Sequence, residues 1–398
     1  MPSVSPSARP AETARPVPAT RPRNRRQLIV DAAGRVFSER GYHAASMEDV
    51  AARVDITATA LYRHFPNKYA LFAECAGVMV DGLVAALDEV PSDAPLAEVL
   101  TAVARITVAH RASGGVYRWE ARYLEREDRR RLKTKYDRVV DRVDDAVRRE
   151  HPFPDGRLRA TAALGAIGSI TMHRTSIAQR RAEDLLVKSA LGVAASDPGA
   201  EGAAPAPVEL PARPVPRTRR DEILAAAVPL FARDGFANVT NGQIARAVGL
   251  TPSALYRHYP GKIDVLAAAC LQAADLLARG TERSLRGVTA PYDAVVALAA
   301  THVAYCFEYT DLNSVAEAEL PGLPAEPRRP LVLAQRKHIA VWEHWLRLAR
   351  PELDSRQARA LAHAGFGVVV EAGRRLRWRD GPAARRTVTR LVVGALGL

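Results

Sequence analysis

The sequence is poor in features that several large classes of protein need. Only three cysteines occur in 398 residues, Cys75, Cys270 and Cys306, and no two of them have a CxxC spacing. So few cysteines, and an odd number of them, do not suit a disulfide scaffold and fit a reducing compartment. No apolar run approaches the length of a membrane span, and no apolar segment follows the basic stretch RPRNRR near the N-terminus. We therefore expect a cytoplasmic protein without a membrane span or a secretory signal.

Catalytic motifs are lacking as well. We find no Gly-x-Ser-x-Gly, HExxH or phosphate-loop pattern. Glu120, Glu127 and Asp128 lie in an arginine-rich helical stretch, where surface ion pairs are the simpler interpretation. His302 and Cys306 share a helical face, but two ligands without a third are weak grounds for a metal. We expect no enzyme, no metal and no cofactor.

Basic residues, in contrast, are abundant. The chain has 57 Lys and Arg against 44 Asp and Glu, a formal charge of +13. This balance favours a polyanionic partner, nucleic acid before membrane, although a solvated basic surface remains the plain alternative. Aromatic residues make up only 6% of the chain and Ala is frequent. Apolar residues follow a helical period almost throughout, and no convincing period-2 strand occurs, so we expect an all-α fold.

The chain contains a long internal repeat. LYRHFPNK at residues 61–68 returns as LYRHYPGK at residues 255–262, an offset of 255 − 61 = 194. Residues 23–68 match 217–262 without gaps at this offset, for example at Phe37 and Phe231. A later block repeats at an offset of 199, for example at Asp155 and Asp354. The five-residue difference fits a change in loop length, so a unit of about 190 residues is duplicated.

Each copy begins with the pattern of a helix-turn-helix. Ile29, Ala32, Ala33, Val36 and Phe37 form one apolar stripe of a helix, and their counterparts do the same in the second copy. A glycine then ends the helix, at residue 41 or 235. Two short helices should follow, with a hydroxyl residue able to cap each. The turn between them carries a glycine at residue 249 but an aspartate at residue 55, which tolerates the left-handed conformation it needs.

This pattern matches the needs of DNA binding. Helix N-termini and capping hydroxyls can bind phosphates, and short side chains let a helix approach base edges. The arginines that precede the first helix of each copy, which we call the basic leader, and a lysine that follows the third helix can reach along the DNA backbone. The expected DNA-binding residues of the first copy are Arg23, Arg25, Arg26, Ser46, Thr57, Ala58, Thr59, Tyr62, His64 and Lys68. Those of the second copy are Arg217, Arg219, Arg220, Thr240, Thr251, Pro252, Ser253, Tyr256, His258 and Lys262.

The run from each basic leader through LYRHFPNK or LYRHYPGK resembles the DNA-binding domain of TetR-family repressors, and the whole chain resembles the single-chain double-TetR regulators of actinobacteria. The resemblance implies two tandem units, each with an N-terminal helix-turn-helix domain and a helical bundle for ligand binding and dimerisation. The expected segments are a disordered tail (1–22), the first DNA-binding domain (23–83, helix-turn-helix 46–65) and bundle (84–193), a linker (194–216), and the second domain (217–277, helix-turn-helix 240–259) and bundle (278–398).

The expected function is that of a nucleoid-associated transcriptional repressor that a small apolar ligand, lipid-, acyl-CoA- or steroid-like, releases from a double-stranded DNA operator. The small-residue helices of the two bundles should pair within one chain as a pseudo-dimer, with further self-association left open. Candidate pocket aromatics, equally consistent with plain core packing, are Trp119, Tyr123, Tyr305, Phe307, Trp342 and Trp345. The alternative is a basic helical scaffold that binds RNA or anionic surfaces without ligand control.

Overall fold

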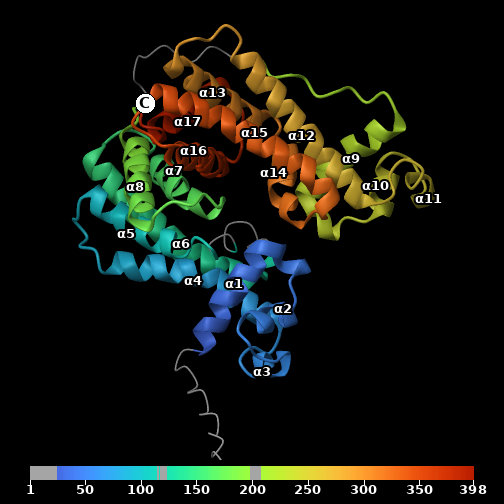
Figure 1. Ribbon diagram of the computed structural model, residues 1–398, viewed down its shortest axis with the longest axis horizontal. Coiled ribbons are helices and arrows are strands. Elements are labelled where there is room, and N and C mark those ends of the chain that lie inside the picture. Colours follow the sequence, from blue (N-terminus) through green and yellow to red (C-terminus); the bar gives the residue numbers. More distant parts are fainter. Residues whose placement is uncertain (1–24, 114–115, 117–122, 198–207) are drawn as a thin grey trace, which may run out of the picture.

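The computed structural model describes residues 25–113, 116, 123–197 and 208–398. All regular elements in these ranges are helices, which confirms the all-α fold class. The predicted tail and Arg23 lie outside the described residues. Two units of similar design follow each other along the chain, residues 25–197 and residues 208–398 (Figure 1).

Each unit begins with a domain of three helices and continues as a bundle. The first three-helix domain consists of α1 (Arg25–Ala44), α2 (Met47–Arg53) and α3 (Ala58–Tyr62), and the first bundle of α4 (Lys68–Asp88), α5 (Leu96–Ala109), α6 (Arg126–Glu150), α7 (Gly156–Gly168), η3 (Ser169–Thr171) and α8 (Gln179–Ala195). The second three-helix domain consists of α9 (Arg219–Asp234), η4 (Phe236–Asn238), α10 (Asn241–Ala247) and α11 (Pro252–Leu255). The second bundle consists of α12 (Lys262–Ser284), α13 (Pro291–Glu308), α14 (Thr310–Glu319), η5 (Leu320–Gly322), α15 (Ala325–Ala349), α16 (Ser355–Arg375) and α17 (Pro382–Ala395).

Local sequence signals determine where the short helices begin. The Ser46 hydroxyl accepts a hydrogen bond from the Asp49 amide at 3.0 Å, and the Asp49 carboxylate accepts one from the Ser46 amide at 3.0 Å. Thr240 and Gln243 form the same reciprocal capping box before α10. These contacts satisfy amides that a helix N-terminus leaves without partners. Gly41, with φ 77°, kinks α1, and Gly235, with φ 78°, ends α9, because both positions need a left-handed backbone.

Among the described residues, one helix, α4, is long and apolar enough to cross a membrane by length and composition alone, a test that the core helix of a bundle also passes. In the structure α4 packs against α1, α5 and α6. Leu71, Phe72 and Val80 are fully buried in the core of the first three-helix domain, which α4 shares. The helix thus serves as a central support of the first unit.

The two units meet along four helices that are rich in small residues. Helix α7 packs along α16, and α8 packs along α17, where the green helices of the first unit meet the red helices of the second (Figure 1). A Cβ atom at Gly165 would lie 2.5 Å from the carbonyl oxygen of Gly367, and one at Gly394 would lie 2.6 Å from that of Gly192. Both contacts also run in the other direction, since a Cβ atom at Gly367 would collide with the carbonyl oxygen of Gly165, and one at Gly192 with that of Gly394. The interface therefore has the reciprocal character of a two-fold dimer contact, formed within one chain.

The chain that enters the second unit is attached to the second bundle. The Tyr309 hydroxyl donates to the carbonyl oxygen of Pro211 at 2.6 Å, and the Arg213 guanidinium lies over the Tyr309 ring. Leu210 is buried beside Gly280, where a side chain on the glycine would touch it. This part of the connection between the units is thus packed rather than free.

We predict that Gly165→Ala destabilises the protein by about 1–3 kcal/mol, because the new Cβ would force α7 and α16 apart. The matched control is Gly77→Ala in α4, whose Cβ would meet only the Asp81 carboxylate at 3.5 Å. That variant should be neutral or up to about 1 kcal/mol more stable, since Ala is the better helix former. Urea unfolding of both variants checks this, and equal stability of the two would contradict the close crossing.

Candidate nucleic-acid interface and ligand cavity

The second and third helices of each three-helix domain are joined by a tight turn. Asp55 has φ 51° and Gly249 has φ 68°, so both turns use the left-handed backbone that the sequence predicts. The amide of Ile56 donates to the Ala51 carbonyl at 3.1 Å, and that of Leu250 to the Ala245 carbonyl at 2.8 Å. Both domains therefore form a helix-turn-helix of the same geometry.

The last helix of each pair exposes small and hydroxyl side chains. Thr57 and Thr251 cap these helices, each accepting a hydrogen bond at 3.2 Å from the amide three residues on. Thr59 and Tyr62 are exposed on α3, as are Pro252 and Ser253 on α11 and Tyr256 directly after it, whereas Ala58 is half-buried. The Tyr256 hydroxyl also accepts a hydrogen bond from the Asn241 amide group at 2.8 Å. Each domain thus presents a narrow polar surface around a helix N-terminus, a form that suits a DNA groove.

Two arginines on this surface were missed by the sequence-based list. Arg63 and Arg257 directly follow the exposed tyrosines and are themselves exposed. No side-chain hydrogen bond or ion pair is found for either in the described part of the chain, so both guanidinium groups remain available to a phosphate. The repeat contains the signal that could have found them, because Arg is one of the letters shared by LYRHFPNK and LYRHYPGK.

The two lysines predicted to contact phosphates form hydrogen bonds within their own domains. Lys262 Nζ donates to the carbonyl oxygens of Phe236, Ala237 and Val239 at 2.8, 3.2 and 2.9 Å. Lys68 Nζ donates to the His43 carbonyl at 3.3 Å and lies over the Tyr42 ring. Burial lowers the pKa of both ammonium groups. Lys68 thus binds a carbonyl at the end of α1, and Lys262 binds carbonyls that follow α9, while a phosphate contact of either lysine stays a prediction.

The basic leaders are also partly used in folding. The Arg26 guanidinium donates to the His64 carbonyl at 2.9 Å, pairs with Glu74 and lies over the Phe65 ring. Arg220 repeats the contact with the His258 carbonyl and lies over the Tyr259 ring. In both copies the last arginine of the leader thus ties the start of the first helix to the end of the helix-turn-helix, and its contact with DNA stays a prediction.

The remaining arginine and histidine candidates differ in how far their side chains are paired or buried. Arg219 pairs with Glu222 at 2.5 Å, and the amide of Arg217 donates to Asp221. His64 and His258 are half-buried, so their rings are only partly open to a ligand. Arg25 is half-buried, with an Nε that has no partner among the described residues.

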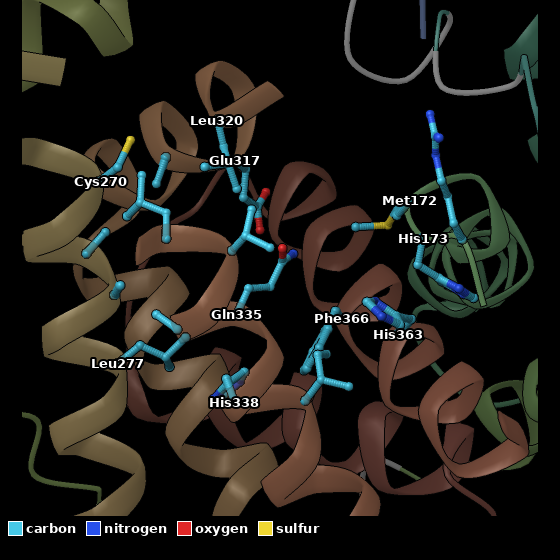
Figure 2. Close-up of a pocket in the computed structure, with 18 of the residues that line it drawn as sticks. Met172, His173, Cys270, Leu277, Glu317, Leu320, Gln335, His338, His363 and Phe366 are labelled. Carbon is cyan, nitrogen blue, oxygen red and sulfur yellow. The ribbon is translucent and has the colours of Figure 1, made fainter. Parts of the chain in front are cut away.

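A cavity of about 1500 Å³ opens on the inner side of the second bundle. In the second unit its walls come from α12 to α16 and η5. In the first unit they come from the C-terminal half of α1, the end of α2 and the segments that follow α5 and η3. Figure 2 shows Leu277 and Cys270 on one side and His363 and Phe366 on the other, with Gln335 and His338 between them. The cavity thus lies between the second bundle and the first unit.

Most of the aromatic residues predicted to line a pocket do not line this cavity. Only Tyr305 does so, and its hydroxyl donates to the Ala273 carbonyl at 3.1 Å. Trp342 is buried behind His338, to which its Nε1 donates at 3.2 Å, and Phe307 packs on Trp378. Trp345 is half-buried against the bundle core outside the cavity, and Tyr123 stacks on Tyr42 in the first unit. Trp119 lies outside the described residues.

Histidines are concentrated around the cavity. His173 from the first unit stacks on His363 from the second, with ring centroids 4.1 Å apart (Figure 2). Burial lowers the pKa of His302 to about 3 and those of His173 and His338 to about 4, and it also lowers the pKa of His363. All four rings are therefore neutral near pH 7. The Nδ1 atom of His302 and the Nε2 atom of His173 have no hydrogen-bond partner among the described residues.

Comparison with known proteins identifies the three-helix domains. The model for "Bacterial regulatory proteins, tetR family" matches residues 29–75 and again residues 223–269. The chain carries two TetR-family DNA-binding domains. The double match agrees with the duplicated helix-turn-helix and confirms the tandem TetR-type organisation.

Curated relatives match over short stretches of the chain. The chain is 42% identical over 64 residues to the HTH-type transcriptional activator FasR of Mycolicibacterium smegmatis, covering 16% of this chain and 29% of that protein. It is 42% identical over 55 residues to the HTH-type transcriptional repressor KstR of the same organism, covering 14% of this chain and 27% of the repressor. The chain thus spans less than a third of the length of these relatives.

Solved structures match over one unit's length. A TetR-family transcriptional regulator from Bordetella parapertussis is 25% identical, with a TM-score of 0.40, over 44% of this chain and 95% of that one. The ketosteroid transcriptional regulator KstR2 of Mycobacterium tuberculosis is 19% identical, with a TM-score of 0.41, over 47% of this chain and 96% of that one.

Lys262→Met should destabilise the second TetR-family domain by about 2 kcal/mol, because three carbonyl oxygens lose a charged donor. Hydrogen exchange of the amides in α9 to α11 measures this local stability. Arg257→Met is the matched control, since it removes an exposed cation and should change the exchange by less than about 0.5 kcal/mol. Slower exchange or no change in Lys262→Met would contradict the structural role.

The free energy of unfolding should fall as the pH drops from about 6.5 towards 4. In this range the histidines of the unfolded chain bind protons, whereas the buried histidines of the folded protein stay neutral. Each neutral histidine contributes up to about 1.4 kcal/mol per pH unit within this window. In His302→Phe, urea unfolding between pH 5 and 6 should take up about one proton fewer. An unchanged pH slope would show that His302 titrates normally in the folded protein.

Proposed function

We propose that this chain is a sequence-specific transcriptional regulator, and a repressor, that binds double-stranded operator DNA through both helix-turn-helix domains. The observation that carries this proposal is the pair of exposed, capped helices α3 and α11, each with an adjacent tyrosine and a free arginine. The net charge of +13 supports it, since a basic protein gains affinity by releasing counterions from DNA.

One chain would act as a pseudo-dimer. The reciprocal contacts of Gly165 with Gly367 and of Gly192 with Gly394 support an internal two-fold pairing of the bundles. Such a pairing supplies two DNA-binding domains without a second chain. Linking the units raises their effective concentration, so pairing within a chain should outcompete pairing between chains.

The two halves of the operator need not be identical. Ala58 of the first domain corresponds to Pro252 of the second, and Glu48 corresponds to Gly242, since 252 − 58 = 242 − 48 = 194. These side chains lie at or near the helix starts that approach the bases. The proposed operator is therefore an imperfect inverted repeat.

A small ligand with a large apolar part would release the operator. The cavity between the second bundle and the first unit supports this role, because it is concave, partly apolar and adjoins the first three-helix domain. A ligand that binds one spacing of the two domains better than another shifts the population towards that spacing and changes DNA affinity.

The test is selection of operator fragments from random duplex DNA, followed by footprinting and light scattering of the complex. We expect one chain per operator and an imperfect inverted repeat. Arg257→Ala should reduce the slope of log affinity against log salt by about one unit, because one phosphate contact is lost.

Two outcomes would contradict this proposal. An operator that always holds two chains, with each half bound by the same domain, would exclude the pseudo-dimer. Competition by single-stranded RNA at the concentrations at which the selected duplex competes would favour the alternative of a basic scaffold without sequence preference.

A further inference from the structure

The cavities of the two bundles differ greatly in volume. The counterpart of the large cavity in the first bundle has a volume of only about 270 Å³. Met79 lines it where the second bundle has Ala273, since 273 − 79 = 194, and Tyr136 lines it where the second bundle has Gln335, since 335 − 136 = 199. Larger side chains at these two positions thus occupy space that the second bundle leaves open.

The open cavity has one wall from the other unit. Arg35, Ser38 and Glu39 reach it from α1, and Met172 to Ser176 reach it from the segment after η3. Helix α1 also contacts η5 of the second unit. A ligand in the second bundle would therefore touch the first three-helix domain directly, without any relay through its own.

The wall from the first unit is strongly basic. It contributes Arg35, Arg53, Arg111 and Arg174 against the single carboxylate of Glu39, a balance of 4 − 1 = +3. The opposite wall, from α12 to α16, combines apolar residues with charged ones. The apolar residues include Ala273, Leu277, Leu331 and Phe366, and the charged ones are Arg286, Arg328 and Lys337 against Glu282 and Glu317. An anionic group is favoured beside the first wall and an apolar body beside the second.

Unsatisfied polar atoms indicate where a neutral polar group of the ligand would bind. His302 lies in the wall with an Nδ1 atom that has no partner among the described residues, and its Nε2 lies 3.7 Å from Cys306 Sγ. His173 offers a second such atom on the wall of the first unit. Buried polar atoms of this kind are normally satisfied, so they point to a group supplied from the cavity.

We propose that the effector is a large amphipathic anion that binds in the second bundle and acts across the interface on the first three-helix domain. This inference rests on the proposed function and specifies its ligand class and regulation. The cavity volume of about 1500 Å³ exceeds the common range of about 300–1000 Å³ for small-molecule sites, which accommodates a bulky body.

Glu39 provides the physical link between the ligand and the DNA-binding surface. Its carboxylate pairs with Arg53 at the end of α2 at 2.6 Å and with Arg174 of the first bundle at 3.8 Å. An anionic group at this wall competes with Glu39 for the same two guanidinium groups. Loss of the Glu39 pairs removes one ion pair between α1 and α2, where Arg40 and Asp49 form another at 2.6 Å, and the ion pair between α1 and the segment after η3. The first three-helix domain could then shift against the first bundle.

The first experiment measures binding of anilinonaphthalene sulfonate, a fluorescent amphipathic anion, to the full chain and its displacement by dodecanoate or dodecanol. We expect saturable fluorescence, displacement by dodecanoate, and at least about tenfold weaker displacement by dodecanol, which lacks the charge. Ala273→Met should reduce dodecanoate affinity at least about tenfold by filling the cavity, whereas Met79→Ala in the first bundle should leave this site unchanged.

One arginine variant tests the basic wall, and a second serves as its control. Arg174→Gln should weaken dodecanoate about fivefold without affecting dodecanol, as expected for one partly solvated ion pair. Arg180→Gln, an exposed arginine of α8 that does not line the cavity, is the matched control and should bind as the parent protein does. Absence of saturable binding, equal affinity for dodecanol, or unchanged affinity in Ala273→Met would overturn the inference.

Footprinting separates this inference from the proposed function. Dodecanoate should weaken protection of the half-site bound by the first domain before that of the second, and Glu39→Gln should reduce this difference. Simultaneous loss of both half-sites, or loss at the second first, would contradict action across the interface. Ligand-free operator binding tests the proposed function alone, and it should be unaffected in Ala273→Met.

Discussion

The contact between the backbones of α7 and α16 at Gly165 and Gly367 is the constraint on which the rest of the molecule depends. With no side chain at either position, the two helices approach until each carbonyl occupies space that a Cβ atom would need. The repetition of this contact at Gly192 and Gly394 defines one orientation of the two bundles. That orientation places the first three-helix domain against the second unit and so forms the cavity wall.

Features that depend on a few neighbouring residues could be predicted from the sequence. The left-handed turns at Asp55 and Gly249 and the caps at Ser46 and Thr57 follow from contacts three to five residues apart. Because these signals occur twice at a constant offset, the duplicated helix-turn-helix and the all-α class could also be predicted.

Features that depend on distant residues could not be predicted. Nothing near Lys262 in the sequence shows that its ammonium group binds carbonyls more than twenty residues earlier, so its charge alone indicated a phosphate contact. Likewise, Trp342 looks like a pocket residue until the structure shows it buried behind His338. The cavity could have been located by comparing the repeats, because Met79 and Ala273 differ sharply in volume.

Joining both units in one polypeptide changes how such differences can arise. In a symmetric homodimer every codon is expressed in both halves, so a methionine that closes one cavity closes the other too. Here positions 79 and 273 are encoded by separate codons, which can mutate independently. One half can give up its cavity while the other keeps it, and selection can act on each half separately. The lineage thereby gains division of labour without a second gene.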